Sequence, residues 1–274
     1  MSRLVNVSIT GGLGNQMFQV ATCLSYAWKH GMKPIFLKGE WIGMASHPGT
    51  HWETFLFRLK EFLVDALPQN IRNYYPEKWD YAPIPNPTEL STPSGNIRLN
   101  GYFQSDKHFS EHSKQIVELF RPSDECISKL TIKYHHINFD EAGILHIRRG
   151  DYLNLKNIHT PLPIDYYKEA IRVVEEKAGR PLKWFIISES SSYEWIKDQE
   201  IFKDFVIVTN DFDYEDLGFM TFFKYFVIAN STFSWWGAFL SQKEEKVVAM
   251  PNNWFGPEGP NPHEGIYPEG WIRV

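Results

Sequence analysis

The chain has 274 residues, of which 43% are hydrophobic and 22% charged, and its formal net charge is −5. This balance is typical of a folded protein and excludes a disordered chain, while the negative charge without a clustered basic face argues against a nucleic-acid partner. The length permits one large domain or two of ordinary size, and we expect two.

The first part of the chain predicts the beginning of a βαβ unit followed by irregular structure. Leu4 to Thr10 is a short apolar stretch typical of a strand, and it runs into a glycine-rich turn. Met17 to His30 carries apolar residues at helical spacing and ends before Gly31. Pro34 to Leu37 predicts a second strand. From Lys38 to Asn100 the periodicity weakens, and we expect irregular loops around short strands.

The rest of the chain predicts strands and helices in alternation, which indicates a parallel sheet. The strands are expected at Gly143–Ile147, Lys183–Ile187, Phe205–Val208 and Phe226–Ala229. The helices are expected at Ser110–Phe120, Asp124 to about Tyr134, from Ile164, Ser192–Lys197, Tyr214–Tyr225 and from Ser234. We place the domain boundary just before the strand at Gly143, which gives domains 1–140 and 141–274.

The glycine-rich segment Gly11–Gln16 (GGLGNQ) follows the first predicted strand. Glycines let backbone N–H groups approach an anion at a helix N-terminus, as in phosphate-binding loops. The segment lacks the lysine of a Walker loop and the GxGxxG spacing of a dinucleotide site, so an ordinary tight turn stays open as the alternative.

The segment His146–Tyr152 (HIRRGDY) follows the strand at Gly143. Alternation along a strand sends His146 and Arg148 to one side and Arg149 to the other. Arg148 can then grip a pyrophosphate through two parallel hydrogen bonds. His146 can be either a core histidine or a functional one. Asp151 can be a general base, but beside two arginines we expect an ion-pair partner.

The segment Asn230–Ala238 (NSTFSWWGA) follows the last predicted strand. Serine and threonine favour helix N-caps, so the hydroxyl groups and free N–H groups here can form a second anion site, opposite the first. The alternative is an ordinary capped helix with its two tryptophans in the core.

No segment predicts a metal site or a serine nucleophile, because the HExxH and GxSxG patterns are absent. Asp211-Phe212-Asp213 matches the short Asp-x-Asp pattern of some metal-dependent enzymes, but these acids precede a predicted helix and would stabilise its positive end. Cys23 and Cys126 lie outside any ligand pattern and are expected as buried free thiols. Without a 20-residue apolar run or an apolar N-terminal leader, a cytoplasmic protein is expected.

Taken together, three segments resemble the characteristic motifs of the bacterial α-1,2-fucosyltransferases, glycosyltransferase family eleven. They are GGLGNQMFQVA, HIRRGDY and DYEDLGFMTFFKYFVIANSTFSWWGAFLS, and they occur in the family's order. GYFQSDKHF, LPIDYYKEAI and NNWF agree as well, so the resemblance spans nearly the whole chain. One departure is Ile187-Ser188-Glu189-Ser190, where the family commonly has Ser-Asp-Asp.

The resemblance implies a GT-B-like α/β fold, in which two Rossmann-like domains face each other across a cleft. The N-terminal domain would lie on the acceptor side and the C-terminal domain would hold GDP-fucose. The implied reaction moves L-fucose from GDP-β-L-fucose to the 2-hydroxyl of a terminal β-galactosyl group, on an oligosaccharide or on a lipid-linked glycan at a membrane surface. It inverts the anomeric centre and uses neither a metal ion nor a cofactor.

The resemblance also assigns roles to residues of this chain. Arg148 would hold the donor phosphates, and Asp216 would read the guanine edge, although its spacing from the Ser/Thr turn is one residue longer than in relatives. Gly14, Asn15 and Gln16 belong to a loop that approaches the phosphates or the reaction centre, with Asn15 catalytic beside Arg148. The other donor-binding residues expected are His146, Ser231, Thr232, Phe233 and Ser234.

Two alternatives stay open at this point. One is an enzyme that transfers fucose in another linkage or to a protein hydroxyl group. The other is a non-catalytic carbohydrate-binding protein, because aromatic residues make up 16% of the chain and flat rings pack against sugars. Core packing accounts for most of these rings, and a binding module leaves both predicted anion sites unexplained.

Overall fold

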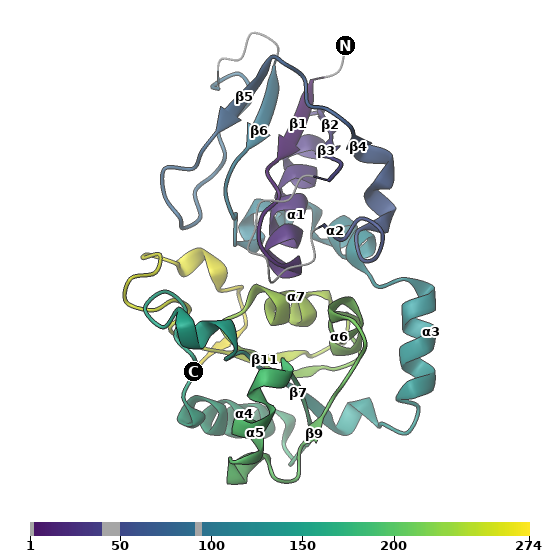
Figure 1. The fold of residues 1–274 in the computed structure, drawn as a ribbon, viewed down its shortest axis with the longest axis vertical. Helices are drawn as coiled ribbons and strands as arrows, with labels where there is room; N and C mark the ends of the chain where they lie inside the picture. The colour runs from purple at the N-terminus through teal and green to yellow at the C-terminus, as the bar shows by residue number, and fades with distance from the viewer. Residues whose placement is uncertain (1–2, 40–49, 91–94) are drawn as a thin grey trace. The chain divides into compact units, whose positions relative to one another are not determined.

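The computed structural model describes residues 3–39, 50–90 and 95–274 and divides the chain into two compact units (Figure 1). Unit 1 comprises Met1–Arg121 and Asn261–Pro268, and unit 2 comprises Pro122–Pro260 and Glu269–Val274. The sequence-based boundary at 140/141 therefore differs from the one at 121/122. The reason is tertiary packing, because α3 (Asp124–Lys133) lies against α6 (Asp213–Met220) of unit 2.

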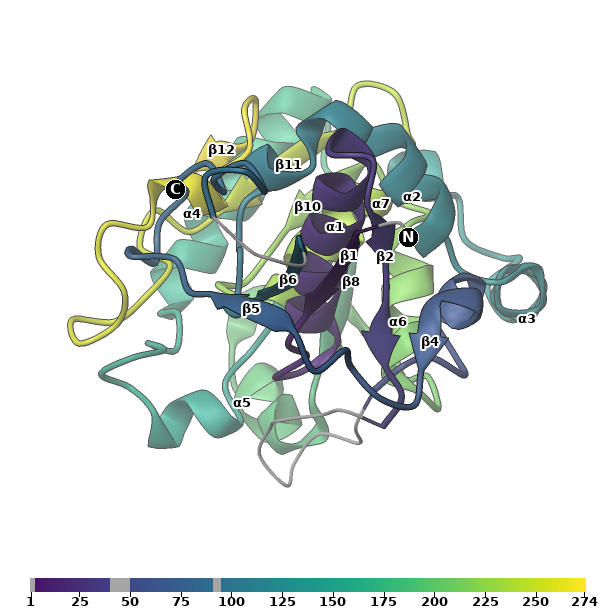
Figure 2. The same ribbon diagram turned by 90° about the horizontal axis from the view of Figure 1, so that it is seen from above.

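Unit 1 is built on a four-stranded sheet whose strand pairings are all parallel. In sheet order its strands are β2 (Lys33–Pro34), β1 (Leu4–Val7), β6 (Asn96–Leu99) and β5 (Ile71–Tyr74). Helix α1 (Leu13–Lys29) packs against β1 and β2, as Figure 2 shows, and is buried along almost its whole length. An apolar helix of this kind forms the centre of a layered domain.

The remaining strands of unit 1 and its second α-helix are short. They are a separate parallel pair, β3 (Phe36–Leu37) and β4 (Leu63–Val64), and helix α2 (Ser113–Phe120). Residues 40–49 and 91–94 of the stretch predicted as loops lie outside the described residues.

Unit 2 is built on a six-stranded sheet that is parallel throughout. In sheet order its strands are β9 (Val206–Ile207), β8 (Lys183–Ser188), β7 (Ala142–Ile147), β10 (Tyr225–Val227), β11 (Val247–Met250) and β12 (Ile272–Arg273). Numbered along the chain this order is 3-2-1-4-5-6, the order of a Rossmann fold.

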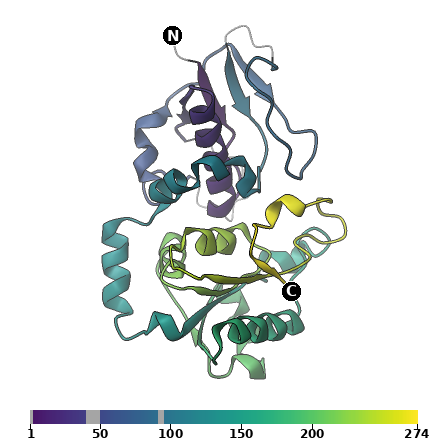
Figure 3. The ribbon, with the colours of Figure 1, turned by 180° about the vertical axis from the view of Figure 1, so that it is seen from behind.

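Helices cover both faces of the six-stranded sheet (Figures 1 and 3). One face carries α4 (Ile164–Ala178) and α5 (Tyr193–Lys197), and the other carries α6 and α7 (Thr232–Leu240). All six residues of β7 are buried, as expected for a central strand covered on both sides.

Some element ends differ from the sequence predictions. The helix predicted to run to Tyr225 ends at Met220, because Tyr225 already pairs with β7 and β11 in the sheet. Cys23 and Cys126 are buried free thiols, as predicted. Of the helices described, none is long and apolar enough to cross a membrane.

Candidate active site

The centre of the unit 2 sheet is its topological switch point. From β7 the chain proceeds to β8 on one side, and after β9 it returns to β10 on the other side of β7. Connections that leave two neighbouring parallel strands in opposite directions open a crevice at the carboxyl ends of those strands, where such sheets bind ligands. Arg148 follows β7, and the turn leading into α7 follows β10.

Arg148 is held at this point by its own turn. Its Nη2 lies 2.9 Å from Oδ1 of Asp151, so the expected ion pair is present. The guanidinium carbon lies 5.6 Å from the centre of the Tyr152 ring, and the Arg148 side chain remains 28% exposed. The hydroxyl group of Tyr152 donates to the carbonyl of Asn230, 2.9 Å away. The Arg148 turn is thereby fastened to the segment that precedes α7.

His146 and Arg149 lie on opposite sides of the strand, as the alternation predicts. The Arg149 guanidinium lies 4.0 Å from the centre of the Trp195 ring of α5, and Ile147 belongs to the core on the same side. His146 lies on the other side, with its ring centre 5.6 Å from that of Phe233 in α7. Arg149 therefore packs on the protein body rather than beside His146.

His146 is buried, and burial lowers its pKa to about 3. The imidazole is therefore neutral at physiological pH and supplies no positive charge to a phosphate. Within the described part of the chain, no hydrogen-bond partner reaches its Nδ1 atom. His146 is thus a neutral polar group in the layer between β7 and α7.

Glu189, which follows β8, stabilises the backbone beside Arg148. Its carboxylate accepts hydrogen bonds from the N–H groups of Arg149, at 2.8 Å, and Gly150, and from the hydroxyl group of Ser192 at 2.6 Å. Burial raises the pKa of Glu189, but these hydrogen bonds outweigh it and lower the pKa below its usual value. No role was predicted for Glu189 from the sequence. The signal that identifies it is an acidic residue directly after β8, the strand that pairs with β7.

The residues at the start of α7 divide into two groups. The hydroxyl group of Ser234 is fully buried and donates to the carbonyl of Ser231 at 3.2 Å, so it faces the protein interior. Thr232 and Phe233 are half-buried in the first turn of α7, directly after its N-cap residue Ser231. The preceding Asn230 side chain donates to the carbonyls of Thr160 and Trp254, each at 3.1 Å, and fixes this turn.

Asp216 lies in the first half of α6, and its Oδ1 accepts a hydrogen bond of 2.9 Å from the Asn210 amide. Burial raises the pKa of Asp216 to about 6. The neighbouring Asp211 and Glu215 both pair with Lys129 of α3. In the described residues, no group of three His, Cys, Asp or Glu side chains is placed to hold a metal ion.

The glycine-rich segment lies in unit 1 and is partly helical. Gly14, Asn15 and Gln16 form the first turn of α1, with Gly12 as the N-cap residue. The buried Gln16 side chain turns back to donate to the carbonyl of Gly11 at 3.0 Å. Oδ1 of Asn15 accepts a hydrogen bond of 3.0 Å from the Gln104 amide. The predicted site residues thus form one group in unit 1 and another in unit 2.

The family model described as Glycosyl transferase family 11 matches residues 53–274. Two curated Escherichia coli proteins are each 28% identical to this chain: the O-antigen biosynthesis glycosyltransferase WbnK and an α-1,2-colitosyltransferase. The alignment with WbnK covers 97% of this chain and 99% of WbnK. The alignment with the colitosyltransferase covers 99% of both chains.

Fucosyltransferase NodZ from Bradyrhizobium is similar in structure, with a TM-score of 0.55 and 14% identity, over 87% of this chain and 92% of NodZ. At this identity the similarity is one of fold. It confirms the expected GT-B-like α/β architecture with two Rossmann-like units.

Proposed function

Because the chain belongs to glycosyl transferase family 11, we propose that it moves L-fucose from GDP-β-L-fucose to the 2-hydroxyl of a terminal β-galactosyl acceptor. The product would carry an α-1,2 linkage, formed with inversion and without a metal ion. The motifs HIRRGDY and NSTFSWWGA support this donor, and a structure of NodZ soaked with GDP-fucose has the same fold. Family membership makes the chain a glycosyltransferase rather than a non-catalytic binding module.

The observation that carries the proposal is the position of Arg148 and the α7 N-terminus at the switch point of the unit 2 sheet. A planar guanidinium can bridge two phosphate oxygens, and the N–H groups of Thr232 and Phe233 can donate to the same diphosphate. The ion pair with Asp151 and the Glu189 contacts to the adjoining backbone hold the Arg148 turn in place before the donor arrives. Preorganised donors of this kind stabilise charge that develops during the reaction.

The chemistry proposed is a direct displacement at C1 of the fucosyl group. The acceptor hydroxyl oxygen forms the new C1–O bond and loses its proton, while the bond from C1 to the β-phosphate oxygen breaks and GDP leaves. The leaving oxygen gains negative charge, and Arg148 and the α7 N–H groups would bind it more tightly in the transition state than in the ground state. The neutral His146 adds no charge to this set.

Asp216 is proposed to select guanine. An ionised carboxylate can accept two hydrogen bonds from the N1–H and amino groups of guanine, which adenine does not present in that arrangement. Its hydrogen bond from Asn210 fixes the orientation of one oxygen. With a pKa of about 6, the group is mostly ionised at pH 7.

A second candidate donor is an activated form of colitose. It is favoured by one observation, namely that a relative aligned over 99% of both chains is an α-1,2-colitosyltransferase. The family and the α-1,2 linkage would then stay the same, and only the transferred sugar would differ.

The two donors can be separated by measuring nucleotide release with each of them in parallel, at equal concentrations and with one β-galactoside acceptor. The proposal expects a higher kcat/KM with GDP-fucose. A kcat/KM at least tenfold higher with nucleotide-activated colitose would assign the second function instead.

A further inference from the structure

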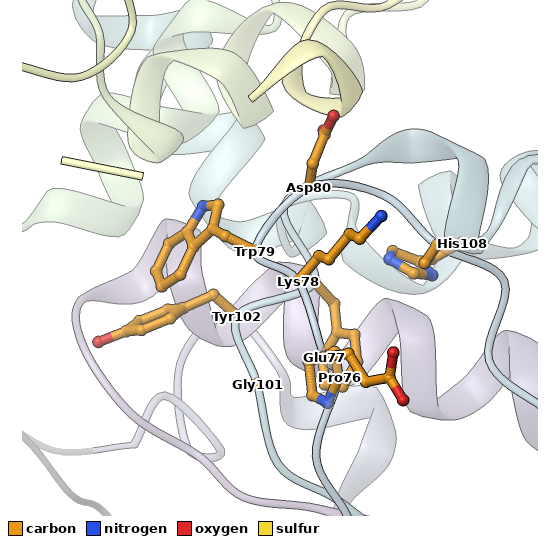
Figure 4. A pocket seen from close by; sticks show the side chains of 10 residues that line it. Pro76, Glu77, Lys78, Trp79, Asp80, Gly101, Tyr102 and His108 are labelled. Atoms are coloured by element: carbon orange, nitrogen blue, oxygen red, sulfur yellow. The ribbon is translucent and has the colours of Figure 1, made fainter. Parts of the chain in front are cut away.

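A pocket of about 160 Å³ lies in unit 1 and is lined by none of the residues proposed to hold the donor (Figure 4). It forms between the segment that follows β5 and the segment that follows β6. Because β5 and β6 are parallel neighbours, their carboxyl ends bring both segments to the same edge of the sheet. The volume is below the roughly 300–1,000 Å³ of sites for drug-sized ligands, which favours an occupant of one sugar ring.

One wall of the pocket is a pair of aromatic rings. Trp79 and Tyr102 have ring centres 4.8 Å apart and ring planes inclined at 40°. Trp79 is 42% exposed although indole is a large apolar group, and Figure 4 shows both rings at the same side of the pocket. A flat ring next to polar groups suits a sugar, whose C–H face packs on the ring while its hydroxyl groups form hydrogen bonds.

The polar side chains of the pocket favour a neutral ligand. Glu77, Lys78 and Asp80 contribute two carboxylates and one ammonium group, so a phosphate would meet more negative than positive charge. Carboxylates and an ammonium group can instead accept from and donate to sugar hydroxyls. His108, which lines the pocket opposite the two rings in Figure 4, is partly buried, and burial lowers its pKa to about 4, so it stays neutral.

The backbone holds these groups in a fixed arrangement. Phe103 adopts a left-handed conformation with φ of 52°, which is unusual for a bulky residue and is often found at functional sites. A Cβ atom on Gly101 would lie 3.1 Å from both Phe103 and Pro76, so the two segments pack closely there. Asp80 accepts a hydrogen bond of 2.6 Å from the N–H of Gly265, which ties the pocket to the C-terminal segment of unit 1.

The pocket is also connected to the glycine-rich segment. Gln104, one residue after Phe103, donates to Oδ1 of Asn15 at 3.0 Å, because β6 and β1 are parallel neighbours and end at the same edge. The segment after β6 therefore contributes Tyr102 and Phe103 to the pocket and contacts the glycine-rich segment through Gln104. We propose that this pocket binds one neutral sugar residue of the acceptor glycan, an inference that rests on the proposed glycosyl transfer for its biological role.

The experiment measures binding of methyl β-D-galactopyranoside, methyl β-D-glucopyranoside and methyl N-acetyl-β-D-glucosaminide by saturation-transfer NMR in the absence of donor. The variants are Trp79→Ala, Trp79→Phe and, as the matched control, Tyr75→Ala. Tyr75 is 67% exposed in the segment after β5, and the residues that line the pocket do not include it. Thermal melting and GDP binding verify that each variant is folded.

We expect at least one of the three glycosides to bind, and Trp79→Ala to raise its Kd about tenfold or more. Trp79→Phe, which keeps an aromatic face, should retain part of the affinity, and Tyr75→Ala should match the parent. With GDP-fucose as donor, Trp79→Ala should raise the KM of the acceptor and leave the Kd for GDP unchanged.

Absence of binding by all three glycosides, or a parent-like Kd in Trp79→Ala, would overturn the pocket assignment whether or not fucose is transferred. Binding that depends on Trp79 in a protein that does not turn over GDP-fucose would support the pocket and contradict the proposed donor.

Discussion

The substitution Arg148→Lys tests the proposed role of the switch-point arginine while keeping its charge. Lysine can still pair with Asp151, which lies 2.9 Å from the present guanidinium, but it offers a point charge in place of a planar pair of donors. Loss of one preorganised contact to developing oxyanion charge lowers the rate by a factor of about 10²–10³, or roughly 2.7–4 kcal/mol. We expect a loss of this size in kcat/KM for GDP-fucose.

Arg149→Lys provides the comparison at the next position of the same turn. Arg149 stacks on Trp195 at 4.0 Å, and a cation–π contact contributes about 0.5–2 kcal/mol to stability. In a chain of this size, each kcal/mol corresponds to about 2–4 °C in Tm. The expected result is a lower Tm with a kinetic loss smaller than tenfold.

Arg172→Lys is the matched control, because Arg172 lies on the exposed face of α4 and pairs only with the exposed Glu169 and Glu176 in the described structure. It should change neither Tm nor kinetics measurably, since exposed ion pairs contribute about 0–1 kcal/mol.

The assay measures GDP release at saturating acceptor, with Tm determined on the same preparations. Equal kinetic damage at Arg148 and Arg149 would mean that the turn brings both guanidinium groups to the donor. A larger loss for Arg149→Lys than for Arg148→Lys would refute the assignment of Arg148 to the phosphates.

Three further predictions concern the acids of unit 2. Asp216→Asn should weaken GDP binding about 10–100-fold in calorimetry without lowering Tm. In the parent protein the GDP affinity should fall as the pH drops through about 6, because the raised pKa lets Asp216 take up a proton there. Unchanged GDP affinity with a lower Tm would instead assign Asp216 to stabilising α6. Glu189→Gln should lower stability by about 1–3 kcal/mol in denaturant titration, because a neutral amide oxygen accepts these three hydrogen bonds more weakly than the carboxylate oxygen does, whereas the exposed Glu194→Gln should be neutral. Activity should persist in excess EDTA, and loss that Mg²⁺ or Mn²⁺ restores would instead make Asp211 and Asp213 metal ligands.

Much of the unit 2 arrangement could be predicted from local sequence patterns. Strand alternation places Ile147 and Arg149 on one side and His146 on the other, and this is what the structure shows. The parallel sheet also follows from alternating strands and helices. Such features are predictable because period-two alternation and short βα connections are properties of neighbouring residues.

Features that depend on distant residues could not be predicted in this way. The unit boundary precedes α3 because Cys126 and Leu130 pack on Gly218, far along the chain. The role of Glu189 depends on the pairing of β8 with β7, which brings its carboxylate to the N–H groups of Gly150 and the residue before it.

The directions of side chains in the first turn of a helix could not be predicted from the sequence either. Gln16 and Ser234 are residue types that can donate hydrogen bonds to an anion. In the structure, however, both side chains donate to nearby backbone carbonyls inside the protein. Local side-chain-to-backbone hydrogen bonds of this kind compete with ligand contacts, and the sequence alone does not decide between them.

The proposed function is tested most directly by the structure of the product formed from GDP-fucose and a methyl β-D-galactopyranoside acceptor, determined by two-dimensional NMR. We predict a fucosyl residue with an α-anomeric proton that shows a through-bond correlation to C2 of galactose. A product linked at any other carbon of galactose, or a β-linked fucosyl residue, would contradict the proposed transfer.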